Sequence, residues 1–316
     1  SFIDSGTGLP TVIQPDPLLL NGGLPTQDSA IDEIGQLIDM IYNQQETANH
    51  ICRKIYRFFV YHEITDAINT NIIAVMADTF RTNNFQLQPV IENLLKSQHF
   101  YEAAAGIPDD NFGGIIKSPL DLVTGTLRFF SHQIPDMTAD PAGFYEQTGE
   151  ILEIMETNGM NFYQPFDVAG YDAYHQYPIY HRSWISVNYL TNRYEFIQRI
   201  VNPMEPGMLK IDVYQYVRDN INISIASNAR SLVIELAKYL LPLTDNLTYD
   251  ASADDTATIT AERLNYFLVT FLSDFDPDPE AQWTIRYTNQ VGISTMQGQL
   301  QNLFNAMMQS PEFQLQ

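Results

Sequence analysis

Cysteine is almost absent from the chain, because Cys52 is the only one. A single cysteine excludes an internal disulfide and the thiolate clusters that hold structural zinc or iron–sulfur groups. Long apolar runs are missing as well. Runs such as Ile72–Met76 are far shorter than the roughly 20 residues of a membrane-spanning helix. The sequence therefore predicts no disulfide framework and no membrane span in this chain.

Basic residues are scarce, with 16 Lys and Arg against 38 Asp and Glu and a formal net charge of -22. Such a negative chain repels phosphate backbones and anionic membrane surfaces, so nucleic acid is a poor partner. Only 17% of the residues are charged. Much of the surface is therefore expected to be neutral and polar.

Apolar residues recur mainly at spacings of three and four, the period of amphipathic helices, and no convincing strand ladder is present. Ser118–Pro119 and Asp140–Pro141 each place a capping side chain before a proline at the first helical position. The sequence predicts an all-α fold, a compact multi-helix array with long ordered loops. The expected helices are Thr47–His62, Asp66–Thr82, about Pro89–Phe100, one from Ser118, one from Asp140 to near Gly159, one capped by Ser183, Asn228–Leu240, Thr260–Phe275 and Ser294–Gln309.

Segments whose apolar residues lack a helical spacing mark the expected domain boundaries. Residues 1–27 should form a loop-like amino-terminal segment and residues 28–316 a helical domain. An alternative is two apposed subdomains, about 28–158 and 183–316, bridged by a loop over residues 159–182. The chain begins without an initiator methionine or a signal segment. This favours a trimmed piece of a longer precursor.

The bridging loop and its end are rich in rings, with eight aromatic residues in the 23 positions from Phe162 to Trp184. Rings are poorly solvated, so this loop should pack on the helices as an ordered cover. The alternative is a ligand platform, because rings flanked by Asn, Asp and Gln also suit sugar binding. The candidate ligand-binding residues are Tyr163, Asp167, Tyr171, Tyr174, Tyr177, Arg182 and Trp184.

The same loop carries the main candidates for catalysis: Asp167, Asp172, His175 and His181. Two imidazoles and two carboxylates could bind a divalent ion or supply a general acid and base. The six-residue spacing of the histidines matches no compact helical ligand pair, however. The structural alternative is that Asp167 caps backbone amides and the histidines are ordinary loop residues.

Recognised catalytic and cofactor motifs are missing elsewhere. Gly292–Met296 lacks the second glycine of a nucleophile elbow, and no His-Glu-x-x-His pair occurs. Asp274–Glu280 alternates acids like a calcium loop, but Pro279 and Ile285 replace the required Gly and Glu. No cofactor and no metal site is predicted.

The few cations have two interpretations. Arg53, Lys54 and Arg57 fall on one expected helix, and Lys117 and Arg128 on or beside another. In so acidic a chain we expect them to pair with carboxylates and to fix helix contacts. The alternative is a small basic pocket for an anionic ligand. The remaining histidines are expected to be ordinary surface or capping residues, and these are His50, His62, His99 and His132.

Five segments over nearly the whole chain carry a resemblance to a known family. They are Glu46–Val60, Leu94–Phe100, Ile116–Asp121, Gln164–Tyr171 with Trp184–Ile185, and Ser310–Gln314. Taken in order, they resemble the bacterial family numbered 1800 among the domains of unknown function. In this family Ser-Pro-Glu-Phe is commoner at residues 97–100, Glu at Asp121, Asn at Asp167 and Trp at Tyr171.

The resemblance implies a mainly helical protein exported from a Gram-negative cell, most similar to Bacteroidetes versions and lacking an amino-terminal portion of the family. It implies no reaction, cofactor or catalytic residue. We therefore expect a non-enzymatic binding or assembly module of the cell envelope, located in the periplasm, on the outer membrane or outside the cell, with a glycan or an envelope protein as partner. The competing hypothesis is a hydrolase, with or without a metal, that uses Asp167, His175 and His181.

Overall fold

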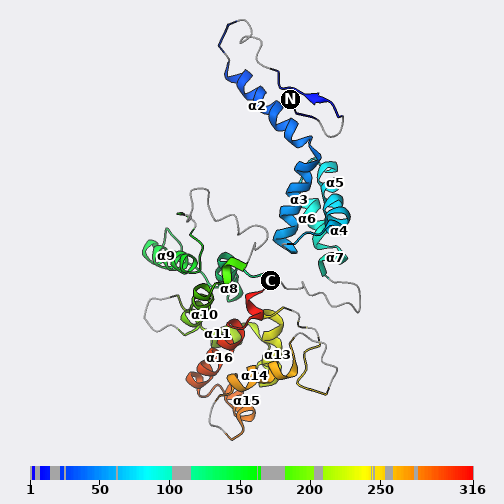
Figure 1. Cartoon of the computed structure of the whole chain (residues 1–316). Coiled ribbons are helices and arrows are strands. Elements are labelled where there is room, and N and C mark those ends of the chain that lie inside the picture. Colours follow the sequence, from blue (N-terminus) through cyan, green and yellow to red (C-terminus); the bar gives the residue numbers. More distant parts are fainter. Residues whose placement is uncertain are drawn as a thin grey trace. The chain divides into compact units, whose positions relative to one another are not determined.

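The computed structural model describes residues 2–3, 8–14, 22–24, 26–61, 63–101, 115–161, 163–164, 182–202, 209–242, 244, 246–252, 259–273 and 277–315. These residues are predominantly helical, which confirms the predicted all-α fold (Figure 1). Within this part of the chain the only sheet is one antiparallel pair of two-residue strands, β1 (Phe2–Ile3) and β2 (Pro10–Thr11).

The chain divides into two compact units, residues 1–112 and residues 113–316. The subdomain alternative placed the bridge at residues 159–182, whereas this boundary lies before the helix that starts at Pro119. The physical reason is that the helices on both sides of the 159–182 loop contribute apolar residues to one shared core.

The first unit contains the strand pair and seven helical segments among its described residues. They are α2 (Gln27–Tyr42), α3 (Gln45–Phe59), α4 (Asp66–Ile68), the π-helical turn η1 (Asn69–Ile73), α5 (Ala74–Thr82), α6 (Leu87–Leu95) and α7 (Gln98–Tyr101). Figure 1 shows that α2 extends away from the bundle formed by α3–α7. Burial in this unit is concentrated on α3, η1, α5 and α6, around Cys52, Tyr56, Ile73, Phe80 and Val90.

The described helices of the second unit follow in chain order. They are α8 (Pro119–Phe129), α9 (Pro141–Thr157), the 3-10 turn η3 (Arg182–Ile185), α10 (Val187–Val201), α11 (Val213–Asn220), α12 (Ile223–Ala226), α13 (Ala229–Leu240), α14 (Ala261–Phe271), α15 (Pro279–Asn289), α16 (Ile293–Met308) and the 3-10 turn η4 (Glu312–Gln314).

Helix α16 is the centre of the second unit, because it packs against α10, α11, α13, α14 and α15. Its Met296, Leu300, Leu303, Phe304 and Met307 are completely buried. An apolar helix surrounded by others is stabilised mainly by burial, at about 1.5–3 kcal/mol for each large side chain. This core fixes the elements that carry the candidate site.

Several predicted helix starts are confirmed by cap hydrogen bonds. Ser118 and Asp121 form a reciprocal capping box on α8, and Asp140 caps α9. Asn228 and Thr260 cap α13 and α14 through their side-chain oxygens. Each cap satisfies backbone N–H groups that would otherwise lack a partner.

Other boundaries differ from the expected ones. Ser183 lies inside η3, and Ser186 caps α10 instead, because its hydroxyl accepts from the N–H of Tyr189. The expected helix Pro89–Phe100 is divided between α6 and α7 around Lys96. Helices α2, α11, α12 and α15 are additional to the expected set, and Asp278 of the acidic run caps α15.

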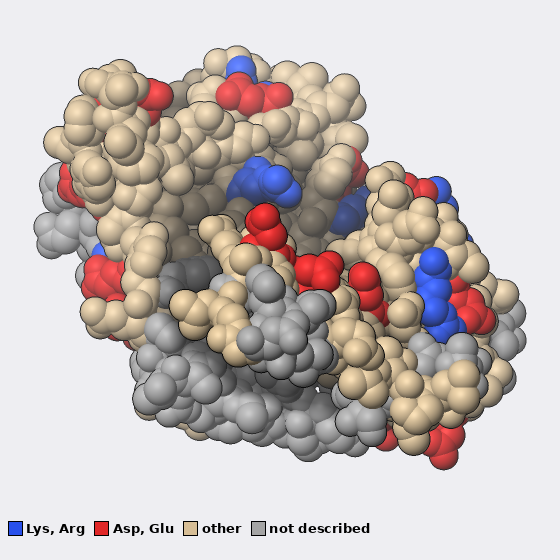
Figure 2. All heavy atoms as spheres, turned by 90° about the horizontal axis from the view of Figure 1, so that it is seen from above, with Lys and Arg blue, Asp and Glu red and all other residues tan. Residues whose placement is uncertain are grey.

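Most of the surface in view is uncharged, as the low share of charged residues predicts (Figure 2). Figure 2 shows one face, on which acidic side chains lie in small groups among neutral residues and Lys and Arg are few. Among the described residues, no helix has both the length and the apolar character that crossing a bilayer requires.

Candidate functional site

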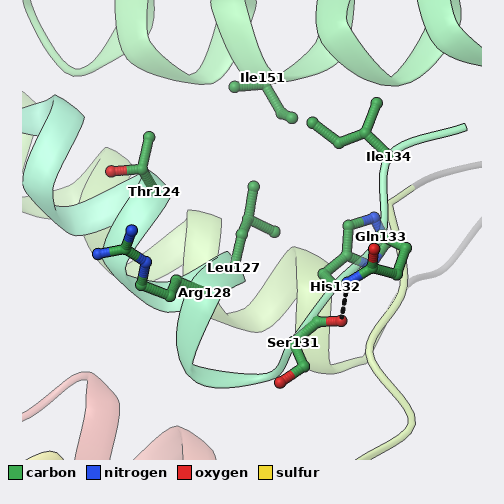
Figure 3. Close-up of a pocket in the computed structure, with 8 residues that line it drawn as sticks. All are labelled: Thr124, Leu127, Arg128, Ser131, His132, Gln133, Ile134 and Ile151. Atoms are coloured by element: carbon green, nitrogen blue, oxygen red, sulfur yellow. Dashed lines mark hydrogen bonds between the residues drawn. The ribbon is translucent and has the colours of Figure 1, made fainter. Parts of the chain in front are cut away.

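A cavity of about 490 Å³ lies between the end of α8, the turn that follows it and α9 (Figure 3). Its volume falls within the range of roughly 300–1,000 Å³ that is usual for small-ligand sites. All of its described lining residues belong to the second unit. The described lining residues are Thr124, Leu127, Arg128, Ser131, His132, Gln133, Ile134 and Ile151.

The turn after α8 presents the polar side of this cavity. Ser131 has a left-handed backbone, with φ of 53°. Its N–H donates to the carbonyl of Arg128, and the N–H of His132 donates to the carbonyl of Leu127 at 2.9 Å. This pair of bonds is the usual left-handed helix ending, which glycine normally fills. A serine in this conformation costs about 1 kcal/mol, so the surrounding structure must hold it there.

Apolar and polar groups occupy different parts of the cavity. Figure 3 shows the side chains of Leu127, Ile134 and Ile151 pointing toward one another. The Arg128 guanidinium lies to one side of them and the His132 ring to the other. A ligand with an apolar body and a polar end would fit this arrangement.

The charges of the lining residues determine which kind of ligand the cavity can bind. None of its described lining residues is an Asp or a Glu, and Arg128 has neither an ion pair nor a hydrogen-bond partner in the described chain. Seven other cations of this acidic protein do form ion pairs within the described ranges. An exposed guanidinium at a cavity without carboxylates is therefore available to bind an anion.

The other polar groups of the lining are mostly occupied. The Thr124 hydroxyl donates to the Leu120 carbonyl at 2.7 Å, and the Gln133 amide donates to the Ser131 carbonyl at 3.0 Å. His132 Nε2 lies 3.0 Å from Gln147 Oε1 on α9, which fits the tautomer with its proton on Nε2. This contact holds the imidazole in place.

The other end of α8 is fixed by the carboxyl-terminal segment. Ile116 pairs with Leu315 in an antiparallel bridge, and the Lys117 N–H donates to the Gln314 carbonyl at 2.8 Å. Lys117 Nζ donates to the Phe313 carbonyl at 2.7 Å and lies 3.9 Å from the centre of the Phe313 ring. We call this group of contacts the terminal anchor.

Arg193 of α10 completes the terminal anchor. Its side chain is fully buried, its Nε donates to Gln314 Oε1 at 3.1 Å, and its Nη2 donates to the Lys117 carbonyl. Its Nη1 has no partner in the described chain. Burial lowers the pKa of Arg193 to about 10, and neighbouring Tyr194 and Asp121 oppose that shift.

The pKa of Lys117 is also shifted by its surroundings. Burial lowers its pKa to about 8, and the nearby charge of Arg193 lowers it further, while Asp121 acts in the opposite direction. Two cations share this anchor with one nearby carboxylate, and that carboxylate accepts from the Ser118 hydroxyl at 2.7 Å. The anchor therefore positions α8 and leaves its cations without carboxylate ion pairs among the described residues.

The residues expected to form the aromatic platform are only partly visible. Tyr163 is 81% exposed, whereas the ring of Trp184 is buried within the second unit. Arg182 belongs to η3, and its side chain lies outside the described set. Asp167, Tyr171, Tyr174, Tyr177, His175 and His181 also lie outside the described residues. The ordered cover, the sugar platform and the hydrolase therefore stay predictions.

The prediction that the cations pair with carboxylates is confirmed for Arg53 and wrong for Lys117 and Arg128. Arg53 pairs with Glu46 at 2.5 Å and its Nε donates to Asn69. Lys117 binds a backbone carbonyl and Arg128 has no acidic partner in the described chain. The physical reason is that Lys117 is partly buried against the terminal segment and Arg128 faces a cavity. For Arg128 the alternative of a small basic pocket for an anionic ligand stays a prediction.

Arg193 was not among the predicted site residues, and His132 was expected to be an ordinary surface or capping residue. Arg193 stands on the face of α10 that carries Phe196, Ile197 and Ile200, all of them buried. An arginine at a core position of an amphipathic helix was the signal that could have indicated it. For His132 no comparable signal exists, because its turn and its cavity depend on packing between α8 and α9.

Within the described part of the chain, no group of three or more His, Cys, Asp or Glu side chains is arranged to hold a metal ion. Cys52 is buried, and burial raises its pKa to about 11, so its thiol is not an activated nucleophile.

Comparison with known proteins identifies a family but indicates no reaction. The profile of a family described as proteins of unknown function, DUF1800, matches residues 16–315. No curated protein and no solved structure matches the chain. Two segments that carried the resemblance, Ile116–Asp121 and Ser310–Gln314, meet in the terminal anchor. Because the family match spans nearly the whole chain, the protein belongs to the DUF1800 family.

Proposed function

We propose that the protein is a non-enzymatic binding or assembly module of the bacterial cell envelope, and that the cavity beside α8 holds the carboxyl-terminal residue of a protein partner. The observation that carries this proposal is the unpaired Arg128 at a cavity with no carboxylate in its described lining. Although the chain has a net charge of -22, this arginine lies at the cavity without an acidic partner in the described chain.

The chemistry of the lining favours a peptide end over a sugar. A guanidinium binds a carboxylate through two parallel hydrogen bonds. Leu127, Ile134 and Ile151 offer an apolar surface for the last side chain of the peptide. No Phe, Tyr or Trp belongs to the described lining, so the stacking surface that sugars usually use is missing there. A peptide ending in a free carboxylate and an apolar residue satisfies both parts of the site.

The envelope location in this proposal comes from the family resemblance. It places the protein in the periplasm, on the outer-membrane surface or outside the cell. Fractionation of cells that express the natural protein tests this part, and recovery in the cytosolic fraction would contradict it.

The ligand is tested with two matched peptides, one ending in a free leucine carboxylate and one ending in leucine amide. Isothermal titration should show the acid binding at least about tenfold more tightly, because a hydrogen bond to a charged group contributes roughly 1.5–3 kcal/mol. Arg128→Gln should abolish the difference between the two peptides.

Arg230→Gln is the matched control. Arg230 is an exposed arginine of the same unit, ion-paired with Glu280 at 2.8 Å and absent from the cavity lining. This variant should keep the preference for the acid. Equal affinity for acid and amide, or no binding of either at millimolar concentration, would refute the carboxylate site.

A further inference from the structure

Helix α2 carries an apolar face that the described chain leaves uncovered. We call Ile31, Ile34, Leu37, Ile38 and Ile41 the α2 face. Each of these side chains is between 41% and 58% exposed. Met40 is the only buried residue of α2. Scattered exposed apolar residues are normal on proteins, but a contiguous group usually marks an interaction surface.

The spacing of the α2 face is that of a helix-packing seam. Ile31, Ile34, Ile38 and Ile41 follow one another at intervals of three, four and three residues, which places them in one stripe. Leu37 widens the stripe on one side, and Gly35 has open space around it. A partner helix can therefore lie along this stripe.

The conformation of α2 is well defined at its start. Thr26 accepts from the N–H of Ser29 at 3.1 Å, and the Ser29 hydroxyl accepts from the N–H of Thr26 at 3.1 Å. This reciprocal capping box satisfies two backbone donors. The exposed face thus belongs to a capped helix of 16 residues that extends away from α3–α7 (Figure 1).

The charges of α2 indicate what kind of helix would bind there. Asp28, Asp32 and Asp39 border the stripe on one side and Glu33 on the other, at 3.6 residues per turn. All four are exposed, none forms an ion pair within the described ranges, and α2 contains no Lys, Arg or His. An apolar stripe between two acidic borders is complementary to an apolar stripe flanked by basic residues.

Two other occupants fit less well. A second copy of the chain would bring acidic borders together, and like charges facing each other across an interface oppose binding. A membrane surface normally binds helices whose polar side is rich in Lys and Arg, and α2 has none.

We propose that the α2 face is the docking surface for an amphipathic helix of a partner protein that carries Lys or Arg beside its apolar stripe. The proposal is independent of the cavity beside α8. The two surfaces would give the protein two separate contacts for assembly.

The test uses the whole chain and two synthetic helical peptides with the same leucine stripe, one flanked by lysines and one by glutamates. Fluorescence anisotropy should show the lysine peptide binding at least tenfold more tightly. Ile34→Ser together with Ile38→Ser should weaken this binding at least tenfold. Asp32→Asn together with Asp39→Asn should reduce the preference for lysine over glutamate.

The matched control is Val269→Ser on α14, which alters an exposed apolar residue of the other unit. It should leave peptide binding unchanged, and circular dichroism should show that all variants keep their helical content. Equal binding of both peptides, or no binding, would overturn the proposal. Concentration-dependent self-association in sedimentation velocity that is lost in the Ile34→Ser, Ile38→Ser variant would overturn it in favour of a second copy.

Discussion

Phe313→Ala should strongly destabilise the second unit, although Phe313 lies near the end of the chain. The ring is buried in the second core, 5% exposed, and Lys117 Nζ lies 3.9 Å from its centre. The variant removes the ring but keeps the backbone carbonyl that accepts from Lys117. It therefore measures what the terminal anchor contributes through packing.

The expected loss follows from two contributions. A buried Phe→Ala replacement costs about 3–5 kcal/mol, because apolar contacts are lost and a cavity remains. The loss of a partly desolvated cation–π contact adds roughly 0.5–2 kcal/mol. We expect the free energy of unfolding to fall by about 4 kcal/mol, which for a unit of this size lowers the melting temperature by roughly 8–16 °C.

The assay can report the second unit alone. Both tryptophans of the chain, Trp184 and Trp283, lie in residues 113–316, so urea titration followed by tryptophan fluorescence measures that unit. Val269→Ala, at a 70% exposed position of the same unit, is the control and should cost less than about 0.5 kcal/mol. A loss below about 1 kcal/mol for Phe313→Ala would refute the anchor as a packed element.

Three further predictions concern polar groups that are buried or partly buried. The folded pKa of Lys117, about 8, lies below its ordinary value of 10.5, so the unfolded chain binds more protons between these values and stability rises with pH there. Relative to Lys117→Met, the wild type should gain about 2 kcal/mol between about pH 7 and about pH 9.5 in urea titrations, and parallel pH profiles would contradict this. Trp283→Phe removes the indole donor that lies 2.9 Å from the buried Ala226 carbonyl, and should cost about 1–3 kcal/mol by circular dichroism, whereas a cost below about 0.5 kcal/mol would show that the carbonyl finds another donor. Cys52 should react with a disulfide reagent at least about 100-fold more slowly in the native protein than in urea, because the thiol is buried with a pKa of about 11, and equal rates would show that it is accessible.

The helical fold could be predicted because its signals are local. Ser118, Asp140 and Asn228 cap helices through bonds to groups only a few residues away. Gly159 takes the left-handed conformation, with φ of 96°, just after α9. The start of α10 was predicted wrongly from the same kind of local signal. Ser183 and Ser186 are equally good caps by composition, but in the structure Ser183 lies in a 3-10 turn and Ser186 caps the helix.

The candidate site could be predicted much less well. Residue type alone could not show whether Arg128 has an acidic partner, since that depends on which helix faces α8. The cavity exists because α9 packs beside the end of α8 and because the turn at Ser131 directs His132 toward Gln147. The sequence placed its candidates in the ring-rich loop instead, where rings and histidines are concentrated.

The sequence by itself determined the all-α class, most helix positions, the family and the strongly negative charge. These follow from periodicity, caps and composition, which act over a few residues or over the chain as a whole. Only the tertiary structure decided that Lys117 and Phe313 meet across 196 positions, that Arg193 is buried beside them, and that Arg128 faces a cavity. Contacts between distant segments depend on how helices pack, and a linear pattern of residues does not specify that packing.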